Sequence, residues 1–139
     1  MFIGQFIKMG EYSELKALQR FSDLITLEQF GLGRFVKGEP SREDIAAALA
    51  GLARTKTILE SGQYKLVIME EANVAAQLGL LSVSDLVKLI LEKPRDVELV
   101  ITGRGASPEL VEVADLVTEM KMVKHYFEKG VRARVGIEK

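Results

Sequence analysis

The 139-residue sequence contains no cysteine and no tryptophan, and it has a single histidine. Without cysteine the chain can form neither a disulfide nor a thiolate metal site, and it has no thiol nucleophile. A lone histidine builds a metal site only with help from carboxylates. Any metal chemistry of this protein must therefore depend on carboxylate side chains.

Long hydrophobic runs and an excess of one charge are also missing. The apolar runs fall far short of the roughly 20 residues that a membrane-spanning helix needs, and the N-terminus lacks the basic and apolar regions of a signal peptide. Nineteen basic residues against twenty acidic ones give a net charge of −1, so no global charge recruits nucleic acid or an anionic membrane. We expect a soluble, cytoplasmic protein that binds neither.

The sequence does contain short apolar runs that alternate with helical patterns, which indicates βαβ units, a parallel sheet and an α/β fold class. Because 47% of the residues are apolar and no linker or repeat divides the chain, one domain is expected over residues 1–139. Strands are predicted at Phe2–Phe6, Leu24–Gln29, Lys65–Glu70, Val97–Thr102 and Leu116–Glu119.

Serine caps mark the predicted helix starts. Ser41 and Ser82 each precede an aspartate by three residues, and Ser107 is followed by a proline at the first helical position. The helix after Ser41 is expected to pack one apolar face on the sheet, with alanines allowing close approach. That predicted face consists of Ile45, Leu49, Leu52 and Leu59.

Polar residues follow four of the predicted strands, at the carboxyl ends where open parallel sheets bind their ligands. Chance explains any one of these groups, but their joint placement predicts one ligand site at this edge. The groups are Gln5 and Lys8 after the first strand, Glu70, Glu71 and Asn73 after the third, Thr102 to Gly105 after the fourth, and Thr118 and Glu119 after the fifth.

Two of these groups are typical of nucleotide sites. An apolar strand that runs into Glu70 and Glu71 has the form of a Walker B segment, whose acid binds nucleotide-associated magnesium. The alternative is that the strand ends in charges because it reaches water. Arg104, between two glycines, can bind phosphate bidentately while the glycines let the backbone approach a ligand. The alternative there is an ordinary turn with a solvated arginine.

Three further features allow a functional and a structural interpretation. His125 is of a residue type that packs or caps more often than it catalyses. The glycine-rich segment Gly31–Gly38, which contains Phe35, can cover a flat apolar ligand, or it can be a plain connection with Phe35 in the core. The tail from Gly130 to Ile137 can be a surface extension or a lid over the site.

Eight segments of the chain together resemble a known family by their order and spacing. They are Gln5–Lys8, Asp44–Ala48, Glu70–Ala75, Gly79–Leu81, Thr102–Ala106, Ala114–Met120, Val123–His125 and Gly130–Glu138, so the match covers nearly the whole chain. Each motif is weak alone. In this order they resemble the ATP:corrinoid adenosyltransferases of the cobalamin pathway. The resemblance implies a RecA-like P-loop NTPase fold with a three-layer parallel sheet, usually as a homodimer.

The resemblance also implies an activity. It is the transfer of the 5′-deoxyadenosyl group of ATP to the cobalt of a reduced corrinoid, in cobalamin biosynthesis or salvage, with Mg²⁺ and a flavodoxin-type or other flavin reductant. No protein nucleophile is expected, because the reduced corrinoid itself attacks. By the same resemblance, ATP would be bound by Lys8, Thr102, Gly103, Arg104 and Glu119, the metal by Glu70 and Glu71, and the corrinoid by Phe35, Asn73 and His125.

The chain departs from the family pattern at three places. Glu70 stands where many relatives have aspartate, and Phe35 substitutes for a tryptophan in the corrinoid loop. The first strand, the G-x-G-K-T phosphate loop and the first helix of the family have no counterpart in this sequence. Because that loop holds the triphosphate, we expect an N-terminally truncated and poorly active chain. The alternatives are a corrinoid-binding or regulatory module without ATP chemistry, and a RecA-like ATPase fragment of other function.

Overall fold

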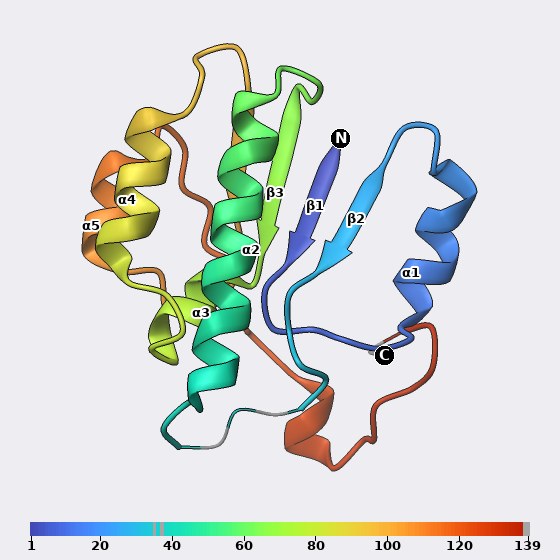
Figure 1. Cartoon of the computed structure of the whole chain (residues 1–139). Helices are drawn as coiled ribbons and strands as arrows, with labels where there is room; N and C mark the ends of the chain where they lie inside the picture. Colours follow the sequence, from blue (N-terminus) through green and yellow to red (C-terminus); the bar gives the residue numbers. More distant parts are fainter. Residues whose placement is uncertain (35, 37, 138–139) are drawn as a thin grey trace.

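The computed structural model describes residues 1–34, 36 and 38–137. Within them lies a four-stranded, all-parallel sheet with the strand order β2-β1-β3-β4, flanked by helices (Figure 1). This confirms the predicted α/β fold and four of the five predicted strands. The strands are β1 (Phe2–Gln5), β2 (Thr26–Gln29), β3 (Leu66–Glu70) and β4 (Glu98–Ile101).

Helices connect these strands and follow the last of them. None of the helices within the described ranges is both long and apolar enough to cross a membrane. They are α1 (Ser13–Leu18), α2 (Arg42–Glu60), α3 (Ala72–Gln77), α4 (Val83–Glu92) and α5 (Pro108–Val113), with short 3-10 helices η1 (Gln19–Phe21) and η2 (Tyr126–Lys129). The predicted serine caps are confirmed, because the side chains of Ser41, Ser82 and Ser107 each accept a backbone N–H of the first turn.

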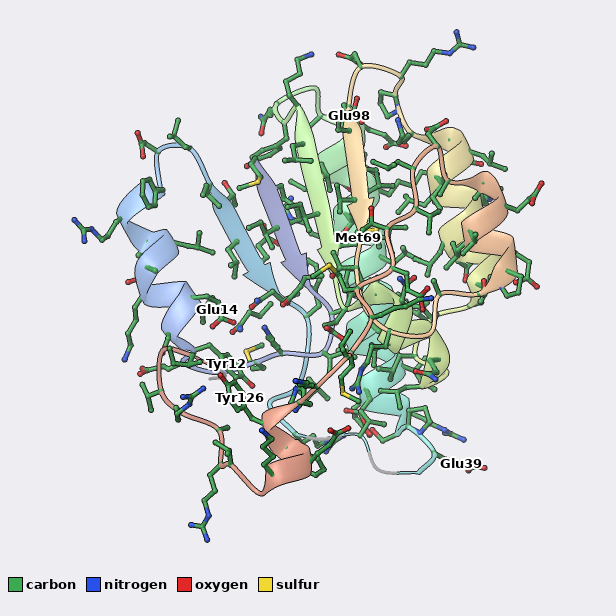
Figure 2. The ribbon with its side chains drawn as sticks, turned by 180° about the vertical axis from the view of Figure 1, so that it is seen from behind. Tyr12, Glu14, Glu39, Met69, Glu98 and Tyr126 are labelled. Atoms are coloured by element: carbon green, nitrogen blue, oxygen red, sulfur yellow. The ribbon has the colours of Figure 1, made fainter. Side chains whose placement is uncertain are left out.

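The fifth predicted strand, Leu116–Glu119, is wrong. This segment forms no strand, and Leu116 is 85% exposed. A strand needs a partner for its backbone N–H and C=O groups. β4 is the edge of the described sheet and pairs only with β3, and the chain after α5 passes β4 without joining the sheet (Figure 2). Apolar β-type residues alone therefore do not make a strand here.

The predicted face of α2 is found except at Leu49: Leu59 is buried, and Ile45 and Leu52 pack against the core. Leu49 is 45% exposed, and the small residues Ala48, Gly51 and Thr55 are buried in addition to the predicted apolar ones. The reason is close approach, since a Cβ on Gly51 would lie 2.5 Å from the ring of Phe30. The buried residues of α2 are Ala48, Gly51, Thr55, Ile58 and Leu59.

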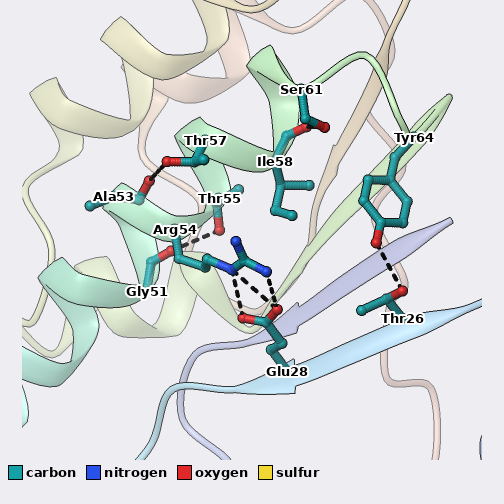
Figure 3. Close-up of polar contacts among 10 residues, drawn as sticks. All are labelled: Thr26, Glu28, Gly51, Ala53, Arg54, Thr55, Thr57, Ile58, Ser61 and Tyr64. Carbon is teal, nitrogen blue, oxygen red and sulfur yellow. Dashed lines mark hydrogen bonds and ion pairs between the residues drawn. The ribbon is translucent and has the colours of Figure 1, made fainter.

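Polar contacts tie α2 and the following turn to the edge strand β2 (Figure 3). The Arg54 guanidinium donates to the Glu28 carboxylate at 2.7 to 3.1 Å. The hydroxyl groups of Tyr64 and Thr26 lie 2.9 Å apart. These contacts fix the sheet beneath α2, and with it the loops that leave the carboxyl ends of the strands.

The two faces of the sheet are buried to different degrees. Phe2, Val67 and Met69 point to the α2 side and are fully buried at 0% exposure. In the neighbouring row Ile3 pairs with Ile68, which pairs with Val100, and Val100 is 41% exposed. The main core thus lies between α2 and one face of the sheet.

Candidate functional site

Predicted polar segments from three different strands meet at the carboxyl edge of the sheet. Lys8, after β1, donates from Nζ to Oε1 of Glu70 at the end of β3, at 2.8 Å. Asn73, at the start of α3, donates from Nδ2 to the carbonyl oxygen of Gly103 after β4, at 3.2 Å. The predicted convergence is therefore found for three of the four groups, whereas Thr118 and Glu119 follow no strand of the described sheet.

Glu71 adopts a strained backbone at this edge. Its φ of 60° and ψ of 19° are left-handed, and no other non-glycine residue of the described ranges has a positive φ. The Glu71 N–H donates to Oγ1 of Thr102 at 3.1 Å, and the Asn73 N–H donates to the Thr102 carbonyl at 3.1 Å. A left-handed glutamate costs about 1–2 kcal/mol. Such strain persists where neighbouring contacts enforce it and is common at functional sites.

The carboxylate of Glu71 is not used to cap α3, although Glu71 occupies the N-cap position. It forms neither an ion pair nor a hydrogen bond with any side chain in the described part of the chain. Thr102 thus holds the strained turn by accepting the backbone N–H groups of Glu71 and Asn73. The Glu71 carboxylate takes no part in these contacts and is available to a ligand.

Lys8 lies between two carboxylates. Its Nζ donates to Oε1 of Glu14 at 3.0 Å as well as to Glu70, and it lies 5.5 Å from the centre of the Tyr12 ring. Burial alone would lower the pKa of Lys8, but the hydrogen bonds to Glu70 and Glu14 raise that pKa above the ordinary value. Burial would raise the pKa of Glu14, but its backbone N–H and Lys8 lower it. The three side chains therefore form a tightly paired cluster.

Two buried oxygens at this edge, Oε2 of Glu70 and Oδ1 of Asn73, have no hydrogen-bond partner among the described residues. A buried polar atom without a partner costs about 1–3 kcal/mol, so such atoms call for an explanation. A hollow of about 700 Å³ opens beside Glu70, within the usual range for small-molecule sites. Its lining includes Lys8, Tyr12, Glu14, Glu70 and, from the C-terminal tail, Gly136. Glu70 thus lines this hollow and also carries a buried oxygen that no described residue satisfies.

The donor set at this edge suits a magnesium ion that arrives with a phosphate. Magnesium prefers oxygen ligands and usually takes one or two carboxylates together with substrate phosphates. Glu70 and Glu71 supply two adjacent carboxylates of this kind. In the described ranges no group of three or more acidic or histidine side chains could hold a metal alone. The remaining ligands would have to come from the substrate and from water.

The turn after β4 brings the predicted arginine to the same edge. Gly103 has a φ of 117°, and a Cβ on it would lie 3.1 Å from the backbone nitrogen of Val74, so glycine is required for this close approach. Arg104 follows it, is exposed, and pairs with no side chain of the described residues. Its guanidinium is therefore free to meet an anion.

The other predicted site residues are placed differently. Asn73 is only 7% exposed and braces the Gly103 turn. Glu119 is exposed and pairs with Lys121 at 3.5 Å. His125 is exposed, and its Nδ1 accepts the Phe127 N–H at 3.0 Å, which caps η2. Phe35 lies outside the described residues.

Sequence reasoning missed Tyr12 and Glu14, which lie past the carboxyl ends of β1 and β2 (Figure 2). It also missed the link from Gln5 to Gln29, whose Nε2 donates to Oε1 of Gln5 at 2.9 Å. α1 is short and buries no residue, so it carries no strong amphipathic pattern. The one signal in the sequence was position, because Tyr12 and Glu14 follow soon after Lys8.

Comparisons with known proteins point to one family. The family model described as ATP:corrinoid adenosyltransferase BtuR/CobO/CobP matches residues 1–138. A corrinoid adenosyltransferase from Sinorhizobium sp is 32% identical and one from Pseudomonas aeruginosa is 34% identical, each over 98% of this chain. The corrinoid adenosyltransferase of Escherichia coli K12 is 32% identical over 68% of this chain. The chain spans 65%, 68% and 48% of the lengths of these three relatives, respectively.

Proposed function

Because the chain belongs to the ATP:corrinoid adenosyltransferase family, we propose that it transfers the 5′-deoxyadenosyl group of ATP to the cobalt of a reduced corrinoid. Its parallel sheet with flanking helices is consistent with the P-loop NTPase-like fold of that family. The observation that carries the proposal is the strained Glu71 beside the unpartnered Glu70 oxygen, at the edge where three strand ends meet. A surface turn without a ligand has no need of this arrangement.

In the proposed reaction the reduced cobalt attacks C5′, the C5′–O bond breaks, and triphosphate leaves with the bonding electrons. The corrinoid is itself the nucleophile, so the protein need supply none. Its task is to hold the two substrates in line and to exclude water. Such positioning places the demand on groups that bind phosphate and metal, which is the kind of group gathered at the carboxyl edge.

We assign the ATP part of the site to the ends of β1, β3 and β4. Glu70 and Glu71 would hold Mg²⁺, which when bound neutralises charge on the triphosphate. The free guanidinium of Arg104 matches the geometry of phosphate oxygens, and Thr102 and Gly103 set the turn that presents it. Lys8 belongs to the same part through the hollow that it lines, and Glu119 remains a proposed contact from the segment after α5.

The corrinoid part and the partners remain proposals that rest on the family. They place Phe35, Asn73 and His125 toward the corrin ring, and they make the protein a cytoplasmic homodimer that receives electrons from a flavodoxin-type or other flavin reductant. The activity would serve cobalamin biosynthesis or salvage. The position of Asn73 supports an indirect role for that residue, because its side chain is buried against the Gly103 turn.

The test is direct detection of the product. The chain is incubated with ATP, Mg²⁺ and chemically reduced cobalamin, and the light-sensitive adenosylcorrinoid is measured by absorbance and chromatography, with the Pseudomonas aeruginosa relative as positive control. We expect product, and a loss of at least about tenfold in Glu71→Gln. The Lys65→Met variant serves as the control, since Lys65 pairs with Asp96 at 2.7 Å at the amino end of the sheet.

The other outcomes separate the alternatives. No product from this chain while the relative is active would refute the proposal for the chain as it stands. Tight corrinoid binding that is independent of nucleotide would favour a corrinoid-binding or regulatory module. Hydrolysis of ATP in the absence of corrinoid would favour an ATPase of another function.

A further inference from the structure

We propose that Lys8 is a positioning residue for Glu70: together with Glu14 it orients the Glu70 carboxylate, and it does not bind the triphosphate itself. This inference rests on the proposed function and makes the contribution of Lys8 to the ATP site indirect. It also adds Glu14, a residue of α1 that no sequence motif singled out, to the groups on which the site depends.

The first argument is the number of donors on the ammonium group. A lysine ammonium has three N–H donors and no acceptor. Two carboxylate oxygens already accept from Nζ, Oε1 of Glu70 at 2.8 Å and Oε1 of Glu14 at 3.0 Å. The Tyr12 ring, with its centre 5.5 Å from Nζ, lies within cation–π distance of the same group. Lys8 therefore has its charge and most of its donors committed within the protein.

The second argument is the charge of the cluster. One ammonium is shared by two carboxylates, so the cluster as a whole is negative. A phosphate would be repelled by this excess of negative charge, whereas a cation or a hydrogen-bond donor would be attracted. The chemistry beside Lys8 thus suits a metal ion or a metal-bound water better than it suits a triphosphate oxygen.

The third argument is the asymmetry of the Glu70 carboxylate. Oε1 is held by Lys8, while Oε2 is buried and has no partner in the described part of the chain. Because the carboxylate is rigid, the hydrogen bond from Lys8 to Oε1 also fixes the direction in which Oε2 points. The side chains of Lys8 and Glu70 are only 32% and 25% exposed, so water competes weakly for this contact. Carboxylates that bind metal commonly depend on such outer contacts, whose loss weakens metal affinity about 10–100-fold.

The two possible roles of Lys8 predict opposite effects of Glu14→Gln. If Lys8 bound the triphosphate, this variant would free the ammonium, remove a negative charge and tighten ATP binding. If Lys8 positions Glu70, the variant loosens Lys8 and weakens binding. The measurement is calorimetric titration with ATP of the wild-type chain, Lys8→Met, Glu14→Gln and the control Lys65→Met, each in Mg²⁺ and in a chelator.

We expect Lys8→Met and Glu14→Gln to weaken ATP binding about tenfold in Mg²⁺ and to leave it unchanged in the chelator, with no effect of Lys65→Met. Lys8→Met should cause no further loss in a Glu70→Gln background. Tighter binding by Glu14→Gln, or an equal loss by Lys8→Met with and without Mg²⁺, would overturn the positioning role.

A second measurement needs no nucleotide. If no variant binds ATP, the proposed function fails, and a cycle of thermal unfolding with Lys8→Met, Glu70→Gln and the double variant still tests the pairing. Residues in direct contact give non-additive effects. We expect the double variant to lose less in Tm than the sum of the two single variants, and additive losses would overturn the inference.

Discussion

Gly31→Ala should separate the loops that follow β1 and β2. Gly31 is buried, and a Cβ there would lie 2.4 Å from the carbonyl oxygen of Ile7 and 2.8 Å from that of Lys8. Both atoms belong to the backbone, so no side-chain rotation can relieve the contact, and the loops must move apart by roughly 1 Å to reach ordinary van der Waals separation. The hydrogen bond from the Gly31 N–H to the Lys8 carbonyl, at 3.2 Å, would break as they part.

The size of the effect follows from these contacts. Overpacking costs about 1–3 kcal/mol, and a lost hydrogen bond about 0.5–1.5 kcal/mol. We therefore expect Gly31→Ala to lower the free energy of unfolding by roughly 2–4 kcal/mol, which should lower the urea midpoint by roughly 1 M or more. The measurement is urea unfolding followed by circular dichroism.

Gly79→Ala is the matched control. Gly79 has a φ of 73° with no atom within 4 Å of an added Cβ, so its substitution carries only the cost of left-handed backbone. That cost is about 1–2 kcal/mol. The Gly31 N–H donates to the Lys8 carbonyl, so moving the Gly31 backbone would also displace Lys8. Gly31→Ala should therefore weaken ATP binding, whereas Gly79→Ala should not. If Gly31→Ala is no more destabilising than Gly79→Ala, the packing of the two loops has been misjudged.

Three further predictions concern the turn at Glu71 and the start of α2. Glu71→Gly should raise the free energy of unfolding by roughly 1 kcal/mol, because glycine adopts the left-handed backbone without strain. The same variant should weaken Mg²⁺-dependent ATP binding. A lower free energy of unfolding would contradict the claim that Glu71 is strained. Thr102→Val should cost about 1–3 kcal/mol in urea unfolding, because the Glu71 N–H loses its acceptor, and an unchanged midpoint would contradict that role. Hydrogen bonds from Arg34 and Ser41 lower the pKa of Asp44, so its ionised form stabilises the fold above the ordinary aspartate pKa near 4, and this stabilisation is lost as pH falls toward the lowered value. Asp44→Asn should therefore flatten the acid loss of stability between pH 7 and 2, and an unchanged pH profile would refute the assignment.

Several parts of this protein were predictable because their cause is local in the sequence. The apolar runs around Val67 and Leu99 predicted strands, and the serine caps at Ser41 and Ser82 predicted helix starts, since each depends on residues within one turn or one strand. The carboxyl-end rule then predicted that Lys8, Glu70 and the Thr102 turn would lie at one edge, because parallel strands align their ends.

Other parts were decided by contacts between residues far apart in the chain. The apolar segment at Leu116 has the composition of a strand but finds no partner in the described sheet, so it stays exposed. The face that α2 buries is set by the Phe30 ring, which admits Gly51 and excludes a larger residue. The spacing of apolar residues along α2 could not predict that the Phe30 ring would pack against it.

The site shows the same division between sequence and tertiary structure. The sequence by itself determined which chemical groups reach the carboxyl edge, because strand ends and glycine turns are local features. Only the tertiary structure decided how those groups are used. Lys8 joins Glu14 to Glu70, which lies 62 residues after Lys8 in the chain, and Glu71 adopts a left-handed backbone where Thr102, 31 residues later, accepts its N–H. Pairings of this kind depend on the arrangement of the elements in space, which no local pattern records.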